Sequence, residues 1–211
     1  MTLVAFDFDG TLSDSEMTVL LGDQCGVADQ MDEITERAMN DEIEYAESLR
    51  QRCALLEGLP EADAQEAFDQ VVLRPKTEAV TDALDSAGVY TAVLTGGFER
   101  GVESALETAG VDVETLIANR LPAEDGELTG NVEGPLIEGT KDDALDILTT
   151  VVDEPMDETI AVGDGANDLP MLEAAGFAVG FAPKPAVEPA CDVIVESMPE
   201  LLNVLEERGV C

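Results

Sequence analysis

Short apolar runs alternate with segments in which apolar residues recur at helical spacing. The runs predict strands at 3–8, 90–94, 159–162, 177–181 and 193–195. The segments between them predict helices at 77–87, 100–109, 140–151 and 169–175. Strands that are apolar along their whole length and alternate with helices indicate a parallel sheet covered on both faces. We therefore expect an α/β fold.

The segment 14–72 interrupts this alternation, because no part of it has a convincing strand pattern. Apolar residues recur at helical spacing within 27–38 and 43–56, and Pro60 opens a further helical segment. The insert is too short for an independent domain, so we expect it to cap the sheet. A smaller irregular stretch at 119–132 favours a hairpin. The predicted division is a core of residues 1–13 and 73–211 with a helical cap of residues 14–72.

The chain is strongly acidic, with 47 Asp and Glu residues against 10 Lys and Arg residues and a formal net charge of −37. A charge of this sign repels nucleic acid and anionic membrane surfaces, so we expect neither as a partner. It also makes the chain repel itself, which salt relieves by shortening the Debye length to roughly 3 Å at 1 M. The composition is typical of proteins from a salt-rich cytoplasm. Disorder is the alternative explanation, and the frequent apolar runs argue against it.

The cysteines and the missing histidines narrow the possible chemistry further. None of the four cysteines forms a C-x-x-C pair, and the sequence has neither a signal-peptide pattern nor a transmembrane run. We therefore expect a cytoplasmic protein with reduced thiols. The chain has no histidine, which excludes histidine-based triads and histidine zinc sites.

Two acidic clusters each follow an apolar run. Asp7 lies within the first run, where an ionised group is costly unless a positive charge pairs with it. Asp9 shares its strand face if the strand continues, and the alternative, a plain turn residue before Gly10, is disfavoured by the second cluster. The second cluster, GDGAND at 163–168, follows the run 159–162. Because ligands of parallel sheets bind at the carboxyl ends of strands, we expect Asp7 and Asp164 to meet and offer Mg²⁺ the oxygen ligands that it prefers.

Two further groups offer donors for a phosphate. Residues 95–97, with the sequence TGG, follow a predicted strand and precede a predicted helix, where free N–H groups bind anions, although a plain turn has the same pattern. Lys141 is one of only three lysines and lies near the start of a predicted helix; a solvated helix face is the alternative. A nucleotide-binding phosphate loop is excluded, because Thr140 separates Gly139 from Lys141.

The order of these motifs resembles that of the haloacid dehalogenase superfamily of phosphotransferases. The matching motifs are DFDGT at 7–11, LTGG at 94–97, Lys141 and GDGAND at 163–168. Glu16, SLRQR at 48–52 and NRL at 119–121 resemble the branch of the superfamily that hydrolyses O-phosphoserine. The resemblance implies a Rossmann-like core, a helical cap inserted after the first strand, and an Mg²⁺ cofactor.

The resemblance also implies a role for each acidic motif residue. Asp7 would be the nucleophile that forms a phosphoaspartyl intermediate, a route that replaces one difficult step with two easier ones. Asp9 would protonate the serine leaving group and then activate water to hydrolyse the intermediate. Mg²⁺ would be held by Asp7, by the backbone carbonyl of Asp9 and by Asp164, and Asp168 would support the metal's water shell.

Phosphate binding is implied for a second set of residues. Thr95, the backbone amide of Gly96 and Lys141 would bind the phosphoryl oxygens, and Asn167 would support the substrate phosphate. Thr95 stands where the family usually has serine. It keeps the hydroxyl and adds a methyl group, so phosphate binding is still expected.

The cap carries the residues expected to select the substrate. One stripe of a predicted helix consists of Tyr45, Leu49, Arg52 and Leu56. An arginine among apolar neighbours needs an anion, and its fork suits a carboxylate, although a salt bridge within the cap is an alternative. By resemblance, Arg52 would hold the substrate carboxylate and Glu16 its ammonium group, while Met39 and Tyr45 would line the apolar side of the pocket.

The resemblance, carried by the four motifs with Glu16 and Arg52, therefore implies an Mg²⁺-dependent phosphatase that releases serine and phosphate from O-phosphoserine, the last step of serine synthesis. One alternative keeps the chemistry and changes the substrate to another small phosphomonoester, or passes the phosphoryl group to an amino-acid alcohol. A second alternative is a non-enzymatic acidic module that only binds cations. The expected state is a monomer or a homodimer.

Overall fold

The computed structural model describes residues 2–39 and 42–211. In this part of the chain a parallel sheet has the strand order β3-β2-β1-β6-β7-β8. The central strand β1 pairs on both sides, with Ala5 opposite Ala92 of β2 and Ala161 of β6. The strands are β1 (Leu3–Phe6), β2 (Tyr90–Phe98), β3 (Thr115–Asn119), β6 (Ile160–Gly163), β7 (Phe177–Phe181) and β8 (Val193–Val195).

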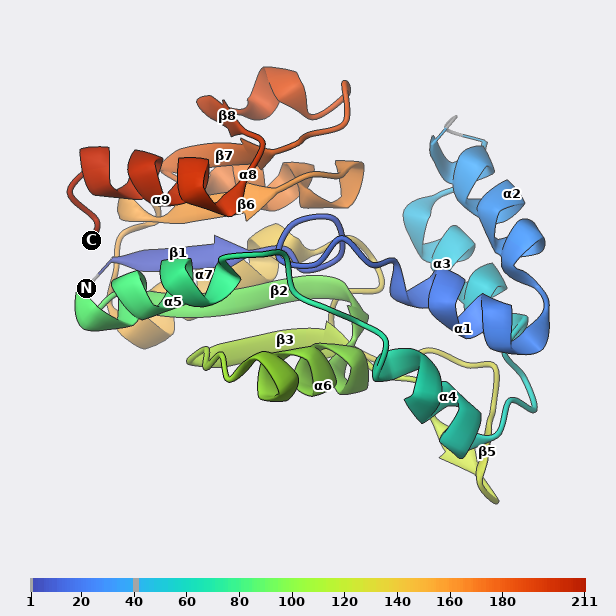
Figure 1. Ribbon diagram of the computed structural model, residues 1–211. Coiled ribbons are helices and arrows are strands. Elements are labelled where there is room, and N and C mark those ends of the chain that lie inside the picture. The colour runs from blue at the N-terminus through green and yellow to red at the C-terminus, as the bar shows by residue number, and fades with distance from the viewer. Residues whose placement is uncertain (1, 40–41) are drawn as a thin grey trace.

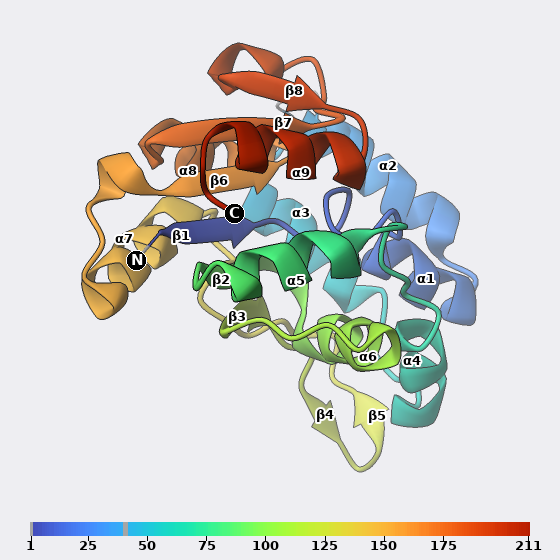
Figure 2. The same cartoon turned by 60° about the vertical axis from the view of Figure 1, so that its left-hand side comes forward.

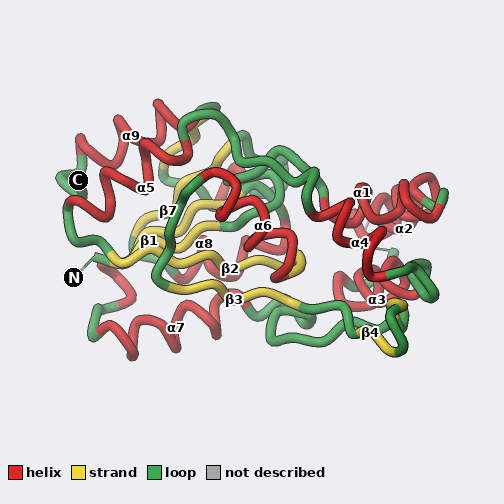
Figure 3. The backbone as a smooth tube through the Cα atoms, turned by 60° about the horizontal axis from the view of Figure 1, so that its bottom comes forward, coloured by secondary structure: helices red, strands yellow, loops and turns green. Residues whose placement is uncertain are grey.

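Helices cover both faces of the sheet (Figures 2 and 3). Successive residues of β1 enter opposite layers, because Val4 and Phe6 belong to one apolar cluster and Leu3 and Ala5 to the other. One face carries α5 (Thr77–Ser86), α6 (Glu99–Ala109) and α9 (Met198–Glu207), and the other carries α7 (Lys141–Val152) and α8 (Leu169–Ala174). Short 3₁₀ segments are η1 (Met156–Glu158), η2 (Ala166–Asp168) and η3 (Glu188–Ala190).

Among the residues that the structure describes between β1 and α5, four helices lie beyond the carboxyl ends of the strands (Figure 1). They are α1 (Met17–Cys25), α2 (Ala28–Met39), α3 (Tyr45–Ala54) and α4 (Glu61–Phe68). A hairpin of β4 (Ala123–Glu124) and β5 (Glu127–Leu128) meets the turn between α3 and α4. There the Gly58 N–H donates to the Leu128 carbonyl at 2.9 Å, the Leu128 N–H to the Leu59 carbonyl at 2.8 Å, and the Glu61 N–H to the Gly126 carbonyl at 2.9 Å.

The α/β fold with a parallel sheet and the predicted hairpin are confirmed. The strand β3 and the helices α1 and α9 are not among the elements predicted from the sequence. The second predicted strand ends at Leu94, whereas β2 continues to Phe98 through a register irregularity against β3. The TGG segment is therefore the distal part of a strand, and α6 begins only after Phe98.

Candidate active site

Asp7 directly follows the last residue of β1 and is held at the carboxyl edge of the sheet. Its N–H donates to the Val162 carbonyl of β6 at 2.8 Å, which continues the strand pairing by one residue. Its side chain is buried, and Oδ1 accepts a hydrogen bond from Lys141 Nζ at 2.5 Å. Burial and the negative charge of Asp168 raise the pKa of Asp7 to about 8, although Lys141 opposes this effect. The positive charge of Lys141 therefore does not fully offset the effects of burial and of Asp168 on Asp7.

Lys141 is the first residue of α7, and its ammonium group joins two carboxylates. Nζ lies 2.5 Å from Asp7 Oδ1 and 2.5 Å from Asp168 Oδ1, and only 2% of the lysine is exposed. Burial lowers the pKa of Lys141, but the facing carboxylates of Asp168 and Asp7 outweigh burial and raise the pKa above its ordinary value. The alternative explanation of Lys141, a solvated helix face, is therefore excluded by its burial.

Asp168 connects this lysine to the loop after β6. While Oδ1 accepts from Lys141, Oδ2 accepts from the N–H groups of Asp164 at 2.9 Å and Gly165 at 2.8 Å. Both oxygens of a fully buried carboxylate are thus engaged. Asp168 consequently fixes the ammonium group of Lys141 and the backbone that carries Asp164 at the same time.

The turn after β1 brings the two acidic clusters together. Gly10 has φ +90°, and an ideal Cβ atom on it would lie 2.6 Å from the carboxyl carbon of Asp164. Burial raises the pKa of Asp164 to about 6, although Lys184, with Nζ 3.3 Å from Asp164 Oδ2, opposes the effect. Burial, followed by the negative charges of Glu16 and Asp7, raises the pKa of Asp9 well above its ordinary value. The turn therefore gathers carboxyl groups that favour the protonated form.

The carboxylates fit a hard divalent cation. One oxygen each from Asp7, Asp164 and Asp168 lie within 4.8 Å of one another, and all three residues are buried. A divalent cation prefers such oxygen donors, and its charge would stabilise the ionised forms that burial disfavours. Oδ1 of Asp9 is also buried and has no hydrogen-bond partner among the described residues. Since the oxygens of Asp168 are already engaged, Asp7 and Asp164 are the carboxylates left to contact an ion directly.

The distal part of β2 lies beside this cluster. Thr95 is buried, and its hydroxyl accepts a hydrogen bond from the Gly97 N–H at 2.9 Å. An ideal Cβ atom on Gly96 would lie 1.9 Å from the Tyr45 hydroxyl of α3, and one on Gly97 would lie 3.0 Å from Asp9 Oδ2. The glycines therefore let a core strand approach both the acidic turn and the helical insert without intervening side chains.

Asn167 lies on the loop of the second acidic cluster and is half-buried. Its Oδ1 would lie 2.8 Å from an ideal Cβ on Gly165, and Lys184 Nζ would lie 3.6 Å from the same point. The structure thus places Asn167 beside the backbone that bonds to Asp168, on the same loop as Asp164.

Arg52 reaches from α3 to α1 within the helical insert. Its Nη1 donates to the Thr18 hydroxyl at 3.1 Å, and its Nε is buried without a partner among the described residues. Arg50, two residues away, is exposed and forms an ion pair with Glu138. A buried guanidinium N–H without a partner is costly and marks a place where an acceptor is expected. The neighbouring arginines therefore have different environments, as the helical stripe predicted.

The other predicted site residues of the insert differ in their exposure and in their distance from the acidic cluster. Glu16 is exposed at the N-cap of α1, yet its charge acts on Asp9. Burial raises the pKa of Tyr45 to about 12, while the charges of Lys141 and Arg52 oppose the shift. Tyr45 therefore lies close enough to the acidic cluster for the charge of Lys141 to affect the pKa of Tyr45. The side chain of Met39 lies outside the described part of the structure.

Two cations at the site were not identified from the sequence. Lys184 pairs with Asp164, and Arg74 donates to the carbonyls of Gly10 and Thr11. Neither belongs to a recognised motif. The one sequence feature that could have identified them is the small number of cations. A chain with only 10 Lys and Arg residues has few positive charges to place beside its carboxylates.

Residues 4–173 match the family model described as haloacid dehalogenase-like hydrolase. The chain therefore belongs to the haloacid dehalogenase-like hydrolase family. This match covers the acidic turn after β1, the helical insert, Lys141 and the loop of Asp164.

Relatives within the family are more specific. The chain is 51% identical over 210 residues, covering 100% of both chains, to the phosphoserine phosphatase of Halobacterium salinarum. It is 34% identical to the phosphoserine phosphatase of Methanocaldococcus jannaschii, covering 92% of each chain. A solved structure described as a phospho-aspartyl intermediate analogue of phosphoserine phosphatase is similar with a TM-score of 0.89 and 33% identity, covering 96% of this chain and 97% of the other. None of the helices described here has the length and apolarity needed to span a membrane.

Proposed function

We propose that this chain hydrolyses O-phosphoserine to serine and phosphate through a phosphoaspartyl intermediate on Asp7. The observation that carries the proposal is the buried contact of Asp7 with Lys141 beneath a helical insert that presents Arg52. The full-length similarity to phosphoserine phosphatases supports the same substrate. Release of serine would make this the last step of serine synthesis.

Two residues of the acidic turn perform the proposed chemistry. A carboxylate oxygen of Asp7 attacks phosphorus, the bond from phosphorus to the serine oxygen breaks, and Asp9 donates a proton to that oxygen. Water then attacks the phosphorus atom, Asp9 accepts a proton from the water, and the aspartyl–phosphorus bond breaks to release phosphate. The raised pKa of Asp9 supports its role as the acid of the first step.

We propose that the metal is Mg²⁺ and that its ligands are Asp7, the backbone carbonyl of Asp9, and Asp164. Asp168 supports the water shell of the metal. When bound, Mg²⁺ would offset the repulsion between Asp7 and the anionic phosphoryl group. Lys141 supplies a second positive charge directly against Asp7. The buried, closely spaced carboxylates support this assignment.

The phosphoryl oxygens are assigned to Lys141, the Thr95 hydroxyl, the Gly96 amide and Asn167. Proximity supports this set, because β2 approaches Asp9 where its glycines lack side chains. Such donors, fixed before the substrate arrives, stabilise charge that develops during transfer.

Recognition of the serine part of the substrate is assigned to the insert, with residues 14–72 as the cap. Arg52 holds the substrate carboxylate, and Glu16 holds the substrate ammonium group. Met39 and Tyr45 line the apolar side of the pocket. The buried Nε of Arg52, for which the described residues provide no acceptor, supports the first of these assignments. The proposed setting of the protein is a salt-rich cytoplasm. The net charge of −37 and the four free cysteines support this setting. The proposed oligomeric state is a monomer or homodimer.

The first experiment measures phosphate release from a panel of phosphorylated metabolites with Mg²⁺ in concentrated KCl. O-phosphoserine is expected to be the preferred substrate, and Asp7→Asn is expected to abolish turnover while keeping the circular dichroism spectrum. Beryllium fluoride should form a stable phosphoaspartyl mimic at Asp7. A protein that only binds cations would release no phosphate and form no such adduct.

The second experiment separates substrate choice from chemistry. Arg52→Ala is expected to lower kcat/KM for phosphoserine about 10- to 100-fold, the loss for a charged hydrogen bond, and to affect an aryl phosphate far less. Arg50→Ala is the matched control, because Arg50 is exposed on the same helix. Equal losses on both substrates would favour the alternative of another small phosphomonoester.

A further inference from the structure

Arg74 binds three consecutive carbonyl groups of the turn after β1. Its Nε donates to the Thr11 carbonyl at 3.0 Å and its Nη2 to the Gly10 carbonyl at 3.0 Å. Its backbone N–H donates to the Leu12 carbonyl at 2.7 Å. One residue of the segment that returns from the insert to the core therefore fixes the backbone of the turn at three points.

Arg74 is itself anchored to the core from two sides. Its guanidinium lies over the Phe181 ring at the end of β7, 5.1 Å from the ring centroid. Its own carbonyl accepts a hydrogen bond from the Thr77 hydroxyl at 2.9 Å, at the first residue of α5. The turn is thereby connected through Arg74 to a core strand and a core helix.

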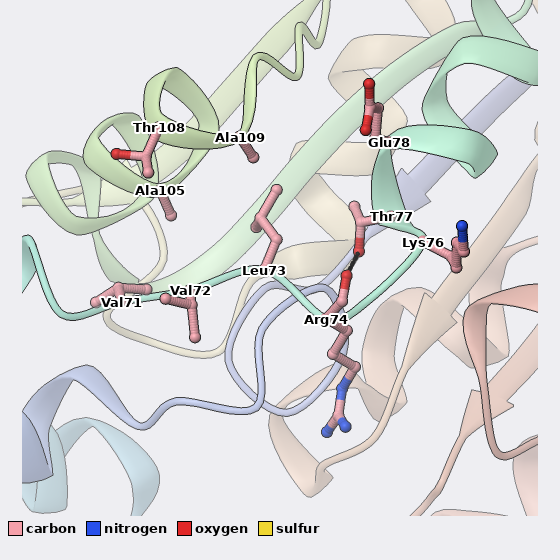
Figure 4. Close-up of a pocket in the computed structure, with 10 residues that line it drawn as sticks. All are labelled: Val71, Val72, Leu73, Arg74, Lys76, Thr77, Glu78, Ala105, Thr108 and Ala109. Carbon is pink, nitrogen blue, oxygen red and sulfur yellow. Dashed lines mark hydrogen bonds between the residues drawn. The ribbon is translucent and has the colours of Figure 1, made fainter.

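A cavity of about 310 Å³ lies beside the segment that contains Arg74, but the guanidinium group extends towards the turn after β1 (Figure 4). Figure 4 shows the side chain of Arg74 extending away from Val71 and Leu73 and towards the loop that follows β1. The walls around Val71, Leu73 and Ala105 are aliphatic. Nε and Nη2 of Arg74 therefore act on the turn.

The turn held by Arg74 carries the groups that need the most exact placement. Asp9 lies on it, and Gly10 touches the carboxylate of Asp164. We propose that Arg74 is a positioning residue for the reaction, which keeps this turn in the geometry that aligns Asp9 and Asp164 with the phosphoryl group. The inference rests on the proposed function for its kinetic part, and its structural part is independent of substrate.

The kinetic test compares Arg74→Ala with Arg208→Ala in the full chain with Mg²⁺ and phosphoserine. Arg208 is the matched control, because its guanidinium lies over Phe177 at the other end of β7, 3.5 Å from the ring centroid. Arg74→Ala is expected to lower kcat about tenfold or more with a much smaller change in KM, as when a charged hydrogen bond in the catalytic frame is lost. Arg208→Ala is expected to lower thermal stability and keep kcat.

Rescue distinguishes positioning from general stability. Millimolar guanidinium chloride, far below denaturing concentrations, should raise the kcat of Arg74→Ala and leave the kcat of Arg208→Ala unchanged. If Arg74→Ala does not fold, Arg74→Met keeps the apolar stem over Phe181 and decides the question with the same kcat comparison. Equal kcat values for the Arg74 and Arg208 variants, or no rescue of Arg74→Ala, would overturn the proposal.

The structural test follows hydrogen exchange in a peptide that covers residues 8–13. Exchange should be faster in Arg74→Ala, or in Arg74→Met, than in the wild type, and unchanged in Arg208→Ala. Unchanged exchange in the Arg74 variant would overturn the proposal. If the wild type released no phosphate from phosphoserine, the proposed function would fail, while this exchange comparison would still decide the role of Arg74.

Discussion

Gly10 and Asp164 are in direct contact at the meeting point of the two acidic clusters. An ideal Cβ atom on Gly10 would lie 2.6 Å from the carboxyl carbon of Asp164 and from both of its carboxylate oxygens. The φ of +90° at Gly10 turns the backbone so that this approach is possible. A side chain at position 10 is therefore excluded by both space and conformation.

Gly10→Ala is expected to displace Asp164 and reduce Mg²⁺ affinity and turnover by about tenfold or more, the scale of a perturbed metal-site neighbour. Isothermal titration calorimetry measures the affinity without substrate. Gly58→Ala is the matched control, because Gly58 has a similar φ of +81° and an ideal Cβ there has no atom of a described residue within 4 Å. Both variants should lose about 1 kcal/mol of stability from backbone strain, but only Gly10→Ala should lose metal affinity. Equal affinities for the two variants would contradict the assigned contact.

Asp168→Asn is expected to destabilise the protein by about 3 kcal/mol, because Lys141 would lose one of two partners in a buried site. Urea denaturation in constant KCl measures the change. Asp143→Asn is the control, since Asp143 is an exposed acid on the same helix as Lys141. If the two substitutions have the same effect on the free energy of unfolding, Asp168 does not hold Lys141 as described.

The stability of the metal-free protein should fall as pH rises towards 8. Burial raises the pKa of Asp164 to about 6, and burial with the charge of Asp168 raises that of Asp7 to about 8, both from an ordinary 3.8. The folded state thus binds more protons than the unfolded state within this window, so the contribution of these groups to stability is lost with increasing pH. Thermal unfolding with a chelator should show a smaller decline in Asp7→Asn than in the wild type.

Mg²⁺ should stabilise the folded protein more at pH 8 than at pH 5.5. The carboxylates that bind the ion must be ionised, and the raised pKa values of Asp7 and Asp164 place much of their ionisation above pH 5.5. The increase in melting temperature at a fixed Mg²⁺ concentration measures this directly. An increase that is independent of pH would argue against these two carboxylates as ligands.

Salt should raise the melting temperature even without Mg²⁺. With a net charge of −37, repulsion between acidic groups destabilises the compact state, and KCl shortens the Debye length from about 10 Å at 0.1 M to about 3 Å at 1 M. Differential scanning calorimetry across this range tests the effect, with sucrose as an uncharged control. A melting temperature that does not respond to KCl would show that the acidic surface needs no screening.

The parallel sheet could be predicted because its inner strands are apolar on both faces. Every residue of β1 and of β6 is buried, which leaves an uninterrupted hydrophobic run in the sequence. The edge strand β3 was missed because four of its five residues are only partly buried. An edge strand needs less apolar sequence, so its pattern is weak.

The site was predicted in part for a related reason. Motif residues such as Asp7 and Asp164 follow strong strands, and the order of strands at the sheet's carboxyl edge brings them together. The bond between Lys141 and Asp168 joins two separate elements, and no spacing rule identifies which carboxylate a lysine meets. Arg74 was missed because it acts on backbone carbonyls, which every sequence has.

The hairpin of β4 and β5 changes what can move when substrate enters. Three backbone hydrogen bonds join it to residues 58–61 of the insert. If the insert swung away alone, breaking them would cost about 3 kcal/mol in total, which leaves an open population below about 1%. A lid that carries the hairpin with it keeps these bonds. Such a moving body would be discontinuous in sequence, and it would need a hinge on the core side of β4 and β5 as well as at the two ends of the insert.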